Sequence, residues 1–370
     1  MKEKPKKIIK WSLFALASLL LLSILTVLIF GIIMYSKVYA GIPYVEKSGG
    51  YSWPELDESE IIPIEGSVDE DESQNETGDE VSVEDDTSEN DGNNNDDNKG
   101  NKGSSGVAKE TPIYIVEPID KTIINVLLIG RDVYSSSGGN GRSDSMMVLS
   151  YNKNTGKVSI NSLLRDSLVP IENHGWNRLN ASYSWGGAGL TINTINDVYG
   201  LDIQHYISID YNGFINLIDK IEGVTVFVSK KEADYMNRNY GKNYTEGEVS
   251  FDGKMALEFA RIRKGLGDDW GRTERQRRII VAAMNKVLEL DNVGDIVTLI
   301  NDNIRFVKTN LSSGTIISLA YDFFDKNNSN IETDVIPAKD TWYYATYRGM
   351  SIIKINFDEN KRILHERIYR

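Results

Sequence analysis

Hydrophobic and polar positions divide this chain into three parts. Residues 11–34 carry no charged side chain, and about 24 residues at about 1.5 Å each make a helix long enough to cross a bilayer. Residues 54 to about 110 are dominated by acidic runs, which cannot bury enough surface to offset chain entropy. From residue 112 onwards, apolar blocks recur at spacings typical of a folded domain.

The basic residues before the apolar run orient it in the membrane. They are Lys2, Lys4, Lys6, Lys7 and Lys10, and the positive-inside rule places them in the cytoplasm. A cleaved signal peptide is the alternative, because residues 38–40 resemble a cleavage site, but the apolar run exceeds a typical signal core. We expect a cytoplasmic tail (1–10), a transmembrane helix (11–34), a juxtamembrane and disordered acidic linker (35–111) and an extracytoplasmic domain (112–370).

Within that domain, the pattern predicts strands alternating with helices. Residues 123–129 form an almost wholly apolar run before Gly130, which indicates a buried central strand. Residues 146–151 and 157–163 predict a hairpin. Further predicted helices are 190–199, 211–221, 253–259 (N-capped by Asp252) and 272–290, and further predicted strands are 205–209, 224–228 and 334–336. The class is therefore α/β or α+β, with a mixed sheet flanked by helices.

Composition removes several kinds of chemistry. The chain has no cysteine, which excludes disulfides, Cys-ligated zinc and thiol nucleophiles, and its 3 histidines argue against a His-centred site. The net charge of −13 is unevenly spread, because residues 1–112 carry 10 basic and 22 acidic side chains and the remainder carries 31 and 32. The nearly neutral folded part gives no indication of a nucleic-acid partner.

Two aspartates follow the predicted central strand. Asp132 comes directly after it, where ligand sites of open α/β sheets collect, and the glycine-rich turn at residues 138–141 leads to Arg142 and Asp144. Two carboxylates that converge on one point suit a hard cation such as Mg²⁺, which fills its other positions with water and phosphate. The alternative is that both aspartates cap turns.

Arginines recur further along the chain. Arg165 follows the predicted hairpin; Arg261 and Arg263 point the same way in an extended segment. Arg272 and Gln276 share a helix face, and Asp269 lies near that helix start. Arginines bind phosphate oxygens, so the set predicts a metal-assisted site for a polyphosphorylated substrate. Three further residues, Arg275, Arg277 and Arg278, are expected to form a solvated basic helix start outside the site.

Six ordered motifs carry a family resemblance. They are residues 124–132, 141–146, 162–166, 179–183, 257–263 and 271–276. Together they resemble the LytR-CpsA-Psr family over residues 120–290, and the expected anchor and outward topology agree with it. The family often has Arg at the position of Tyr134 and Pro at that of Leu164, so the grip on the substrate and one local backbone segment are expected to differ here.

The resemblance implies a fold, an activity and site roles. Family members are phosphotransferases of the Gram-positive envelope, and their α/β domain encloses an apolar lipid pocket. They move a glycopolymer with one phosphate from polyprenyl pyrophosphate to peptidoglycan, at the 6-hydroxyl of N-acetylmuramic acid, and release polyprenyl phosphate. By motif position, Asp132 and Asp144 are implied as ligands of Mg²⁺ (or Mn²⁺), and Asp269 as the acidic residue near the acceptor hydroxyl. The implied pyrophosphate-binding residues are Arg142, Arg165, Arg261, Arg263, Arg272 and Gln276.

Apolar and aromatic residues supply candidates for the rest of the substrate. Phe214, Ile215, Leu217, Ile218 and Val224 are candidates for the lipid slot, and Trp176, Tyr183 and Trp185 for sugar stacking, with ordinary core packing as the alternative for each. The same site residues would serve a pyrophosphate hydrolase. A non-catalytic lipid- or wall-binding regulator is a further alternative, and the glycopolymer (a teichoic acid, a capsule or another polysaccharide) and the acceptor (peptidoglycan or protein) stay open.

Overall fold

The computed structural model describes residues 42–47, 52–64, 110–132, 141–263, 265–289, 298, 306–326 and 331–370. The predicted cytoplasmic tail and transmembrane helix lie outside this part, as do residues 65–109 of the predicted linker. Within the described ranges, no helix combines the length and apolar character that crossing a bilayer requires.

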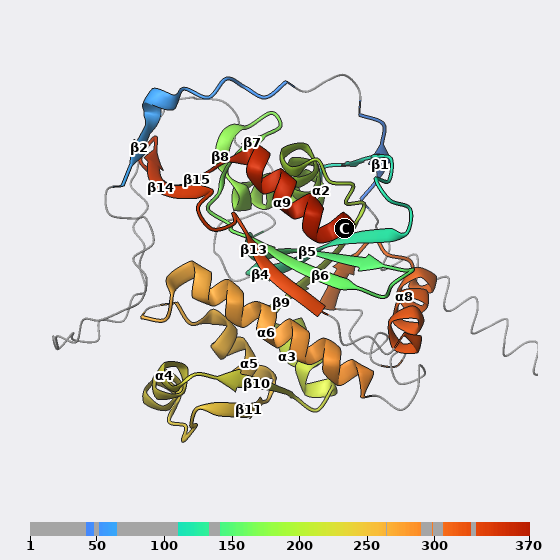
Figure 1. The fold of residues 1–370 in the computed structure, drawn as a ribbon, viewed down its shortest axis with the longest axis vertical. Helices are drawn as coiled ribbons and strands as arrows, with labels where there is room; N and C mark the ends of the chain where they lie inside the picture. Colours follow the sequence, from blue (N-terminus) through green and yellow to red (C-terminus); the bar gives the residue numbers. More distant parts are fainter. Residues whose placement is uncertain are drawn as a thin grey trace, which may run out of the picture.

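A six-stranded mixed sheet forms the centre of the domain (Figure 1). Its strands in spatial order are β12 (Val307–Thr309), β9 (His205–Asp210), β4 (Ile123–Asp132), β5 (Arg142–Asn152), β6 (Val158–Leu163) and β13 (Ile331–Ile336). Strand β4 is antiparallel to β5 and parallel to β9, while β6 is antiparallel to β5 and parallel to β13. The predicted fold class, the central strand and the hairpin are confirmed.

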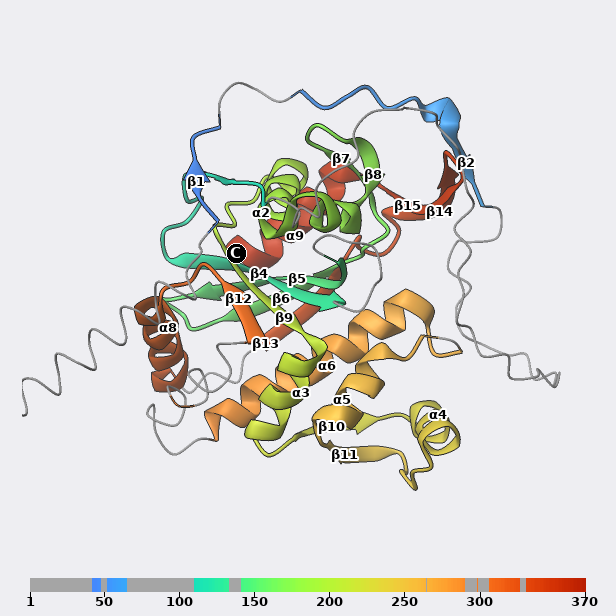
Figure 2. The same ribbon diagram turned by 180° about the vertical axis from the view of Figure 1, so that it is seen from behind.

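Helices cover both faces of this sheet, as the two opposite views show (Figure 1, Figure 2). They are α2 (Leu179–Tyr199) and α9 (Phe357–Tyr369) on one face and α3 (Tyr211–Lys220) and α6 (Asp268–Leu288) on the other, with α8 (Ser313–Asp325) at one end. Leu127 and Met146 pack into the core with α2 and α9, whereas Leu128 and Met147 lie in a cluster with residues of α6 and α8. This period of two is the alternation that a pleated strand imposes.

A smaller layer lies beyond α6. It contains the hairpin β10 (Val224–Val228) and β11 (Gly247–Phe251), with helices α4 (Lys230–Tyr240) and α5 (Gly253–Arg261). Their apolar side chains share a second core with residues of α3 and α6. Asp252 caps α5 as predicted, because its side chain accepts a hydrogen bond of 2.7 Å from the Met255 amide.

The folded domain begins earlier than the predicted start at residue 112. Before residue 112, β1 (Tyr44–Val45) pairs with β3 (Ile113–Tyr114), and β2 (Ile61–Pro63) pairs with β14 (Trp342–Tyr347). Strand β14 also pairs with β15 (Met350–Ile355). Ile42 and Ile61 are buried in these contacts. Such short strands gain their hydrogen bonds only at an edge supplied by distant residues, which a local pattern does not reveal.

Helix α2 begins eleven residues before the predicted start at residue 190. Gly186 and Gly187 have non-helical backbone angles and divide the helix into two parts. Gly187 has φ 64°, which favours glycine, and a Cβ there would lie 1.8 Å from the Glu110 carboxylate. The glycine-rich stretch therefore kinks the helix rather than preceding it.

Candidate active site

A cavity of about 1430 Å³ lies between the sheet and helices α3, α5, α6 and α8. Its wall is largely apolar and includes Val126 and Leu128 of β4, Ile279 and Ala283 of α6, and Phe323 of α8. The volume exceeds the ~300–1,000 Å³ of most small-molecule pockets, so the cavity has room for a long apolar group.

Three of the five lipid-slot candidates line this cavity. Phe214, Leu217 and Ile218 lie on α3 and face it. Val224 is instead buried in the second core, and the Ile215 backbone packs against Gly253. For these two residues, core packing is the better interpretation.

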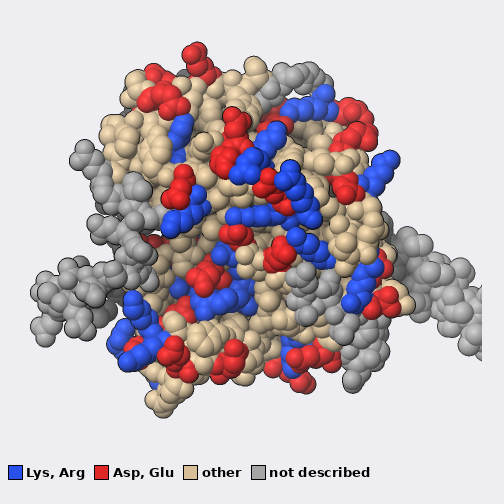
Figure 3. All heavy atoms as spheres, viewed as in Figure 1, with Lys and Arg blue, Asp and Glu red and all other residues tan. Residues whose placement is uncertain are grey.

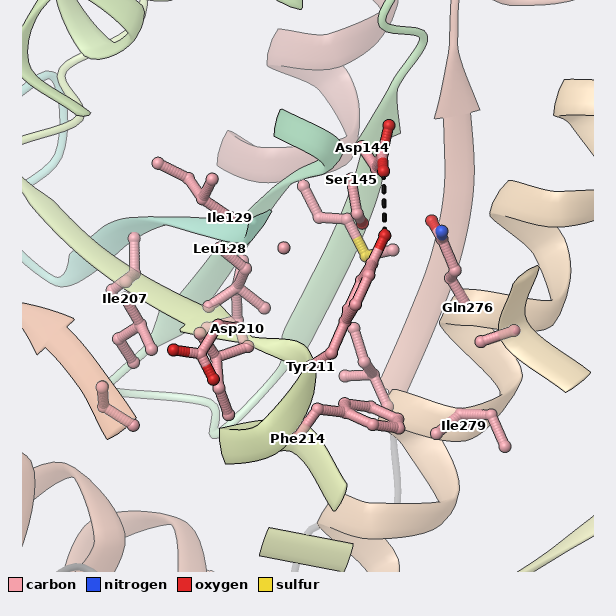
Figure 4. Close-up of a pocket in the computed structure, with 18 of the residues that line it drawn as sticks. Leu128, Ile129, Asp144, Ser145, Ile207, Asp210, Tyr211, Phe214, Gln276 and Ile279 are labelled. Carbon is pink, nitrogen blue, oxygen red and sulfur yellow. Dashed lines mark hydrogen bonds between the residues drawn. The ribbon is translucent and has the colours of Figure 1, made fainter. Parts of the chain in front are cut away.

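Polar residues gather at one end of the cavity. The lining includes most of the predicted site residues: Asp132, Asp144, Arg165, Arg261, Arg263, Arg272 and Gln276. Figure 4 shows Gln276 of α6 and Tyr211 of α3 facing one another across the pocket, with Asp144 beside the tyrosine hydroxyl and Phe214 and Ile279 on the apolar side. Residues from six separate chain segments therefore meet where the apolar wall ends.

Asp144 lies at the centre of this group. Its Oδ1 accepts a hydrogen bond of 3.2 Å from Arg165 Nη1, and its Oδ2 accepts one of 3.0 Å from the Tyr211 hydroxyl. Burial raises the pKa of Tyr211, and the nearby carboxylates of Asp144 and Asp132 raise it further. Tyr211 therefore stays protonated, and its hydroxyl donates a hydrogen bond to Asp144.

Tyr211 was absent from the sequence-based candidates, although a signal existed. Strand β9 runs parallel to β4, with Asp210 paired to Arg131, so the residue after β9 emerges beside Asp132. The residues that follow neighbouring parallel strands share one edge of the sheet. Arg261 lies over the Tyr211 ring, with its guanidinium carbon 5.0 Å from the ring centre.

Asp269 holds three arginines together. Its carboxylate lies 3.1 Å from Arg165 Nε, 3.2 Å from Arg272 Nη2 and 3.7 Å from Arg263 Nε. Burial acts to raise the pKa of Asp269, but the positive charges of Arg272, Arg165 and Arg263 outweigh it and hold that pKa below its usual value. The cavity is lined by these arginines rather than by Asp269 itself. A carboxylate held this way is a weak base.

Arg272 has donors that the described protein groups leave unused. Its side chain is 3% exposed, and within the described part of the chain neither Nε nor Nη1 has a hydrogen-bond partner. Burial lowers its pKa to about 10, although Asp269 acts in the opposite direction. Leaving buried donors unpaired is unfavourable by about 1–3 kcal/mol each. Since Arg272 lines the cavity, an anionic ligand there would satisfy these groups.

The remaining predicted positions are placed as follows. Arg263 is 43% exposed and lies at the cavity mouth. Arg142 pairs through its backbone with Asp132, and its side chain lies outside the described atoms. Tyr134 also lies outside the described residues, whereas Leu164 is buried in the main core, so that departure from the family pattern affects packing.

The donor set suits a magnesium ion, although the described residues form no larger ligand cluster. Among the residues that the structure describes, no three His, Asp or Glu side chains come together as a metal site. Asp132 and Asp144 both line the polar end of the cavity and both act on the Tyr211 hydroxyl. Mg²⁺ commonly takes one or two carboxylates and completes its shell with phosphate and water. The magnesium site stays a prediction that these residues fit.

The three other arginines of α6 are outside the site, as expected, but they are not a solvated face. Arg275 pairs with Glu232 at 3.3 Å and donates to two backbone carbonyls, and its side chain is 3% exposed. Arg277 is buried and donates to Ser162 Oγ at 2.9 Å. Arg278 also pairs with Glu232. Their partners lie on α4 and β6, far away along the chain, so the local sequence pattern does not show that these arginines are paired.

The three sugar-stacking candidates lie in three different environments. Trp176 packs between Trp53 and Phe357 and donates to the Pro54 carbonyl. Tyr183 is 2% exposed and belongs to the main core. Trp185 is the candidate that lines the cavity, and it is 38% exposed.

Charged residues of both signs are mixed on the surface of the domain. On the face in Figure 3, Lys and Arg side chains are interspersed with Asp and Glu. This distribution agrees with the near balance of charge counted for the folded part.

Comparisons with known proteins bear on the whole domain. The model described as the LytR_cpsA_psr family matches residues 81–365. A polyisoprenyl-teichoic acid–peptidoglycan teichoic acid transferase, TagU of Oceanobacillus iheyensis, is 33% identical over 239 residues, which is 61% of this chain and 72% of that protein.

Two solved structures share the fold. TagV of B. subtilis has a TM-score of 0.57 at 23% identity, covering 68% of this chain and 99% of that one. TagT (YwtF) with bound octaprenyl pyrophosphate lipid has a TM-score of 0.54 at 22% identity, covering 69% of this chain and 95% of that one. At these identities the likeness establishes the architecture alone.

Proposed function

Because the chain belongs to the LytR_cpsA_psr family, we propose that it is a phosphotransferase that moves a glycopolymer from a polyprenyl pyrophosphate carrier to peptidoglycan. The acceptor in this proposal is the 6-hydroxyl of muramic acid, and polyprenyl phosphate is released. Residues 11–34 would anchor the enzyme in the membrane, with the domain outside the cell.

The observation that carries this proposal is the position of Arg272. Its two buried donors, which no described residue pairs with, lie where a large apolar cavity meets a group of arginines. A ligand that fills both regions must join a long apolar chain to a multiply charged anion. A polyprenyl pyrophosphate has this composition, and names of the similar proteins, a teichoic acid transferase and a protein with bound octaprenyl pyrophosphate, agree with it.

In this proposal each part of the site has a physical task. The apolar wall takes the polyprenyl chain out of water, and Arg165, Arg261 and Arg272 neutralise the pyrophosphate so that a hydroxyl can approach. Asp269 keeps the arginines in place before the substrate arrives, which reduces their reorganisation during the reaction. Arg263, at the mouth, is positioned to meet the phosphate that carries the glycan.

The transfer exchanges one phosphorus–oxygen bond for another. The acceptor hydroxyl oxygen bonds to the phosphorus that bears the glycan, and the bond from that phosphorus to the bridging oxygen breaks. The leaving polyprenyl phosphate can take the hydroxyl proton, because the second pKa of a phosphate monoester is near 6. Proton removal can be late in phosphoryl transfer, so a strong base is not required. The depressed pKa of Asp269 is compatible with this sequence of events.

A magnesium ion would be held by Asp132 and Asp144, with Tyr211 and Arg165 fixing the orientation of Asp144. When bound, the ion supplies further stabilisation of the charge on the phosphate oxygens. The metal is part of the proposal, and Mn²⁺ is expected to substitute because it also prefers carboxylate and water ligands.

The test uses the full-length protein in detergent with a polyprenyl pyrophosphate oligosaccharide, peptidoglycan fragments and Mg²⁺. Mass spectrometry should show sugar phosphate joined to the fragment and polyprenyl monophosphate released. Arg272→Ala should abolish the joined product, whereas Arg362→Ala, an exposed arginine of α9, should not reduce it. Monophosphate released without a joined product would favour a hydrolase, and bound but unchanged lipid would favour a non-catalytic binding protein.

A further inference from the structure

The first part of α2 forms one side of the cavity mouth. Asn180 and Ser184 are four residues apart, as are Ala181 and Trp185, so the four side chains share one helix face. All four line the cavity, whereas Tyr183 faces the main core. After the kink at Gly186 and Gly187, the helix continues with almost every residue buried. The residues of α2 that line the cavity therefore all lie in the segment before the kink.

Trp185 presents a fixed aromatic surface in this segment. The indole is 38% exposed although tryptophan is among the most apolar side chains, and it contributes to the cavity lining. The His174 ring stacks against it at 4.4 Å between ring centres and 16° between ring planes. This stacking covers one side of the indole and restricts its rotation, so the ring is held in one orientation at the mouth.

Polar side chains close to Trp185 along the chain also line the cavity. They are Asn177, Arg178 and Asn180, from the segment that leads into α2 and begins it. Arg178 is fixed by a hydrogen bond of 2.8 Å from Nε to the Ser351 carbonyl and by Asp166, 3.6 Å from its Nη1. Amide and guanidinium groups around a flat aromatic ring match a pyranose, which has apolar C–H faces and a rim of hydroxyl groups.

The cavity mouth is joined directly to the arginines that would bind the pyrophosphate. The backbone N–H of Asn180 donates to the Arg165 carbonyl at 3.1 Å, and Arg165 and Arg178 share Asp166. If the lipid fills the apolar part of the cavity and the pyrophosphate lies beside Arg165, the glycan attached to the pyrophosphate extends past Asn180 and Trp185.

We infer that Trp185, supported by His174, together with Asn180 and Arg178 forms a carbohydrate subsite for the first sugar of the lipid-linked donor. The inference rests on the proposed function, and it assigns a recognition role to residues outside the arginine group. Trp185 contacts the sugar, and His174 acts through Trp185 as a positioning residue.

Two probes, one with the sugar and one without it, test this subsite. The sugar-free lipid has one more ionisable phosphate oxygen, so each variant is compared with the wild type on the same lipid. The full-length protein in detergent is titrated with a polyprenyl pyrophosphate disaccharide and with the same polyprenyl pyrophosphate lacking sugar. Trp185→Ala should weaken binding of the sugar-bearing lipid about 10-fold, the scale of one aromatic contact, and leave the affinity for the sugar-free lipid unchanged. Trp185→Phe should retain most of the wild-type affinity for the sugar-bearing lipid. His174→Ala should weaken binding of that lipid about 3-fold.

Trp53→Ala is the matched control, because Trp53 is also 38% exposed but packs on Trp176 and Phe357 outside the cavity lining. It should leave both affinities unchanged. An equal loss of affinity for both lipids in Trp185→Ala, or no loss for either, would overturn the subsite while leaving the proposed function standing. Binding of neither lipid by the wild type would overturn both. A raised KM for the peptidoglycan fragment with unchanged donor affinity would assign the sugar to the acceptor and refute the donor subsite.

Discussion

Replacing Asp269 with Asn distinguishes a carboxylate that holds arginines from one that takes a proton. The amide keeps nearly the same shape but carries no charge. Arg272, which is 3% exposed, then loses its carboxylate partner at 3.2 Å, and Arg165 loses the one at 3.1 Å. Arg165 keeps Asp144 as a partner, so Arg272 bears most of the change.

The size of the effect follows from burial. Removing one partner of a buried ion pair commonly destabilises a protein by about 3–5 kcal/mol. Asp269 is 22% exposed and its amide oxygen still accepts a hydrogen bond, so we expect the lower end, about 3 kcal/mol of unfolding free energy. The lowered pKa of Asp269 determines the direction in which its contribution to the unfolding free energy changes with pH. Its stabilisation is complete above the unfolded pKa of about 3.9 and is lost as pH falls through the lower folded value.

The assay is urea unfolding of full-length wild type and Asp269→Asn at pH 7, repeated at pH 3. Asp197→Asn is the control, because Asp197 is 23% exposed but has a single lysine partner, Lys47, at 2.6 Å. It should cost at most about 1 kcal/mol. The difference between wild type and Asp269→Asn should shrink at pH 3.

Inorganic pyrophosphate adds a functional readout to this comparison. A bound pyrophosphate supplies negative charge to the same arginines, so it should stabilise Asp269→Asn more than it stabilises the wild type. Turnover should fall but persist. Unchanged stability together with complete loss of turnover would refute the reasoning, because Asp269 would then act on the proton rather than on the arginines.

Three further substitutions test other parts of the molecule. Ala283→Trp, in the apolar wall, should abolish polyprenyl pyrophosphate binding while inorganic pyrophosphate still binds, as isothermal titration can show. Glu232→Gln should lower the unfolding free energy by about 3 kcal/mol in urea, because buried Arg275 loses its partner between α4 and α6, and should leave lipid affinity intact. Asp144→Asn should raise the Mg²⁺ concentration needed for half-maximal turnover at least 10-fold, and wild-type activity should disappear with EDTA; equal metal dependence in both proteins would contradict the assignment.

Strong local patterns were sufficient for the central part of the fold. Strand β4 is apolar on both faces because both are covered, and that continuous run is visible in the sequence. Helix α4 was missed because its exposed sequence buries only Glu232, Ala233 and Met236. Its capping box, Ser229 with Glu232, was the available signal.

The site was predictable in its residue types but not in its contacts. Motif positions identified Asp144, Arg165 and Arg272, which the structure brings to one end of the cavity. A local pattern does not show that Asp269 binds Arg165 or that the Tyr211 hydroxyl donates a hydrogen bond to Asp144, because the partners are 104 and 67 residues apart along the chain. Only the packing of α3 and α6 against the sheet brings them together.

The early strands β1 and β2 determine which residues limit the reach of the domain from the membrane. Tyr44 donates to the Gln204 carbonyl, and β2 is paired with β14, so the described residues that precede position 65 and follow position 109 both belong to the domain. The number of residues between these positions therefore does not set the distance to the expected anchor. The steps between residues 34 and 42 set it, and they span at most about 28 Å. Tyr44 also contacts Asn310, just before α8, which lines the apolar part of the cavity. In the proposed membrane-anchored enzyme, this short connection would keep the apolar part of the cavity close to the bilayer.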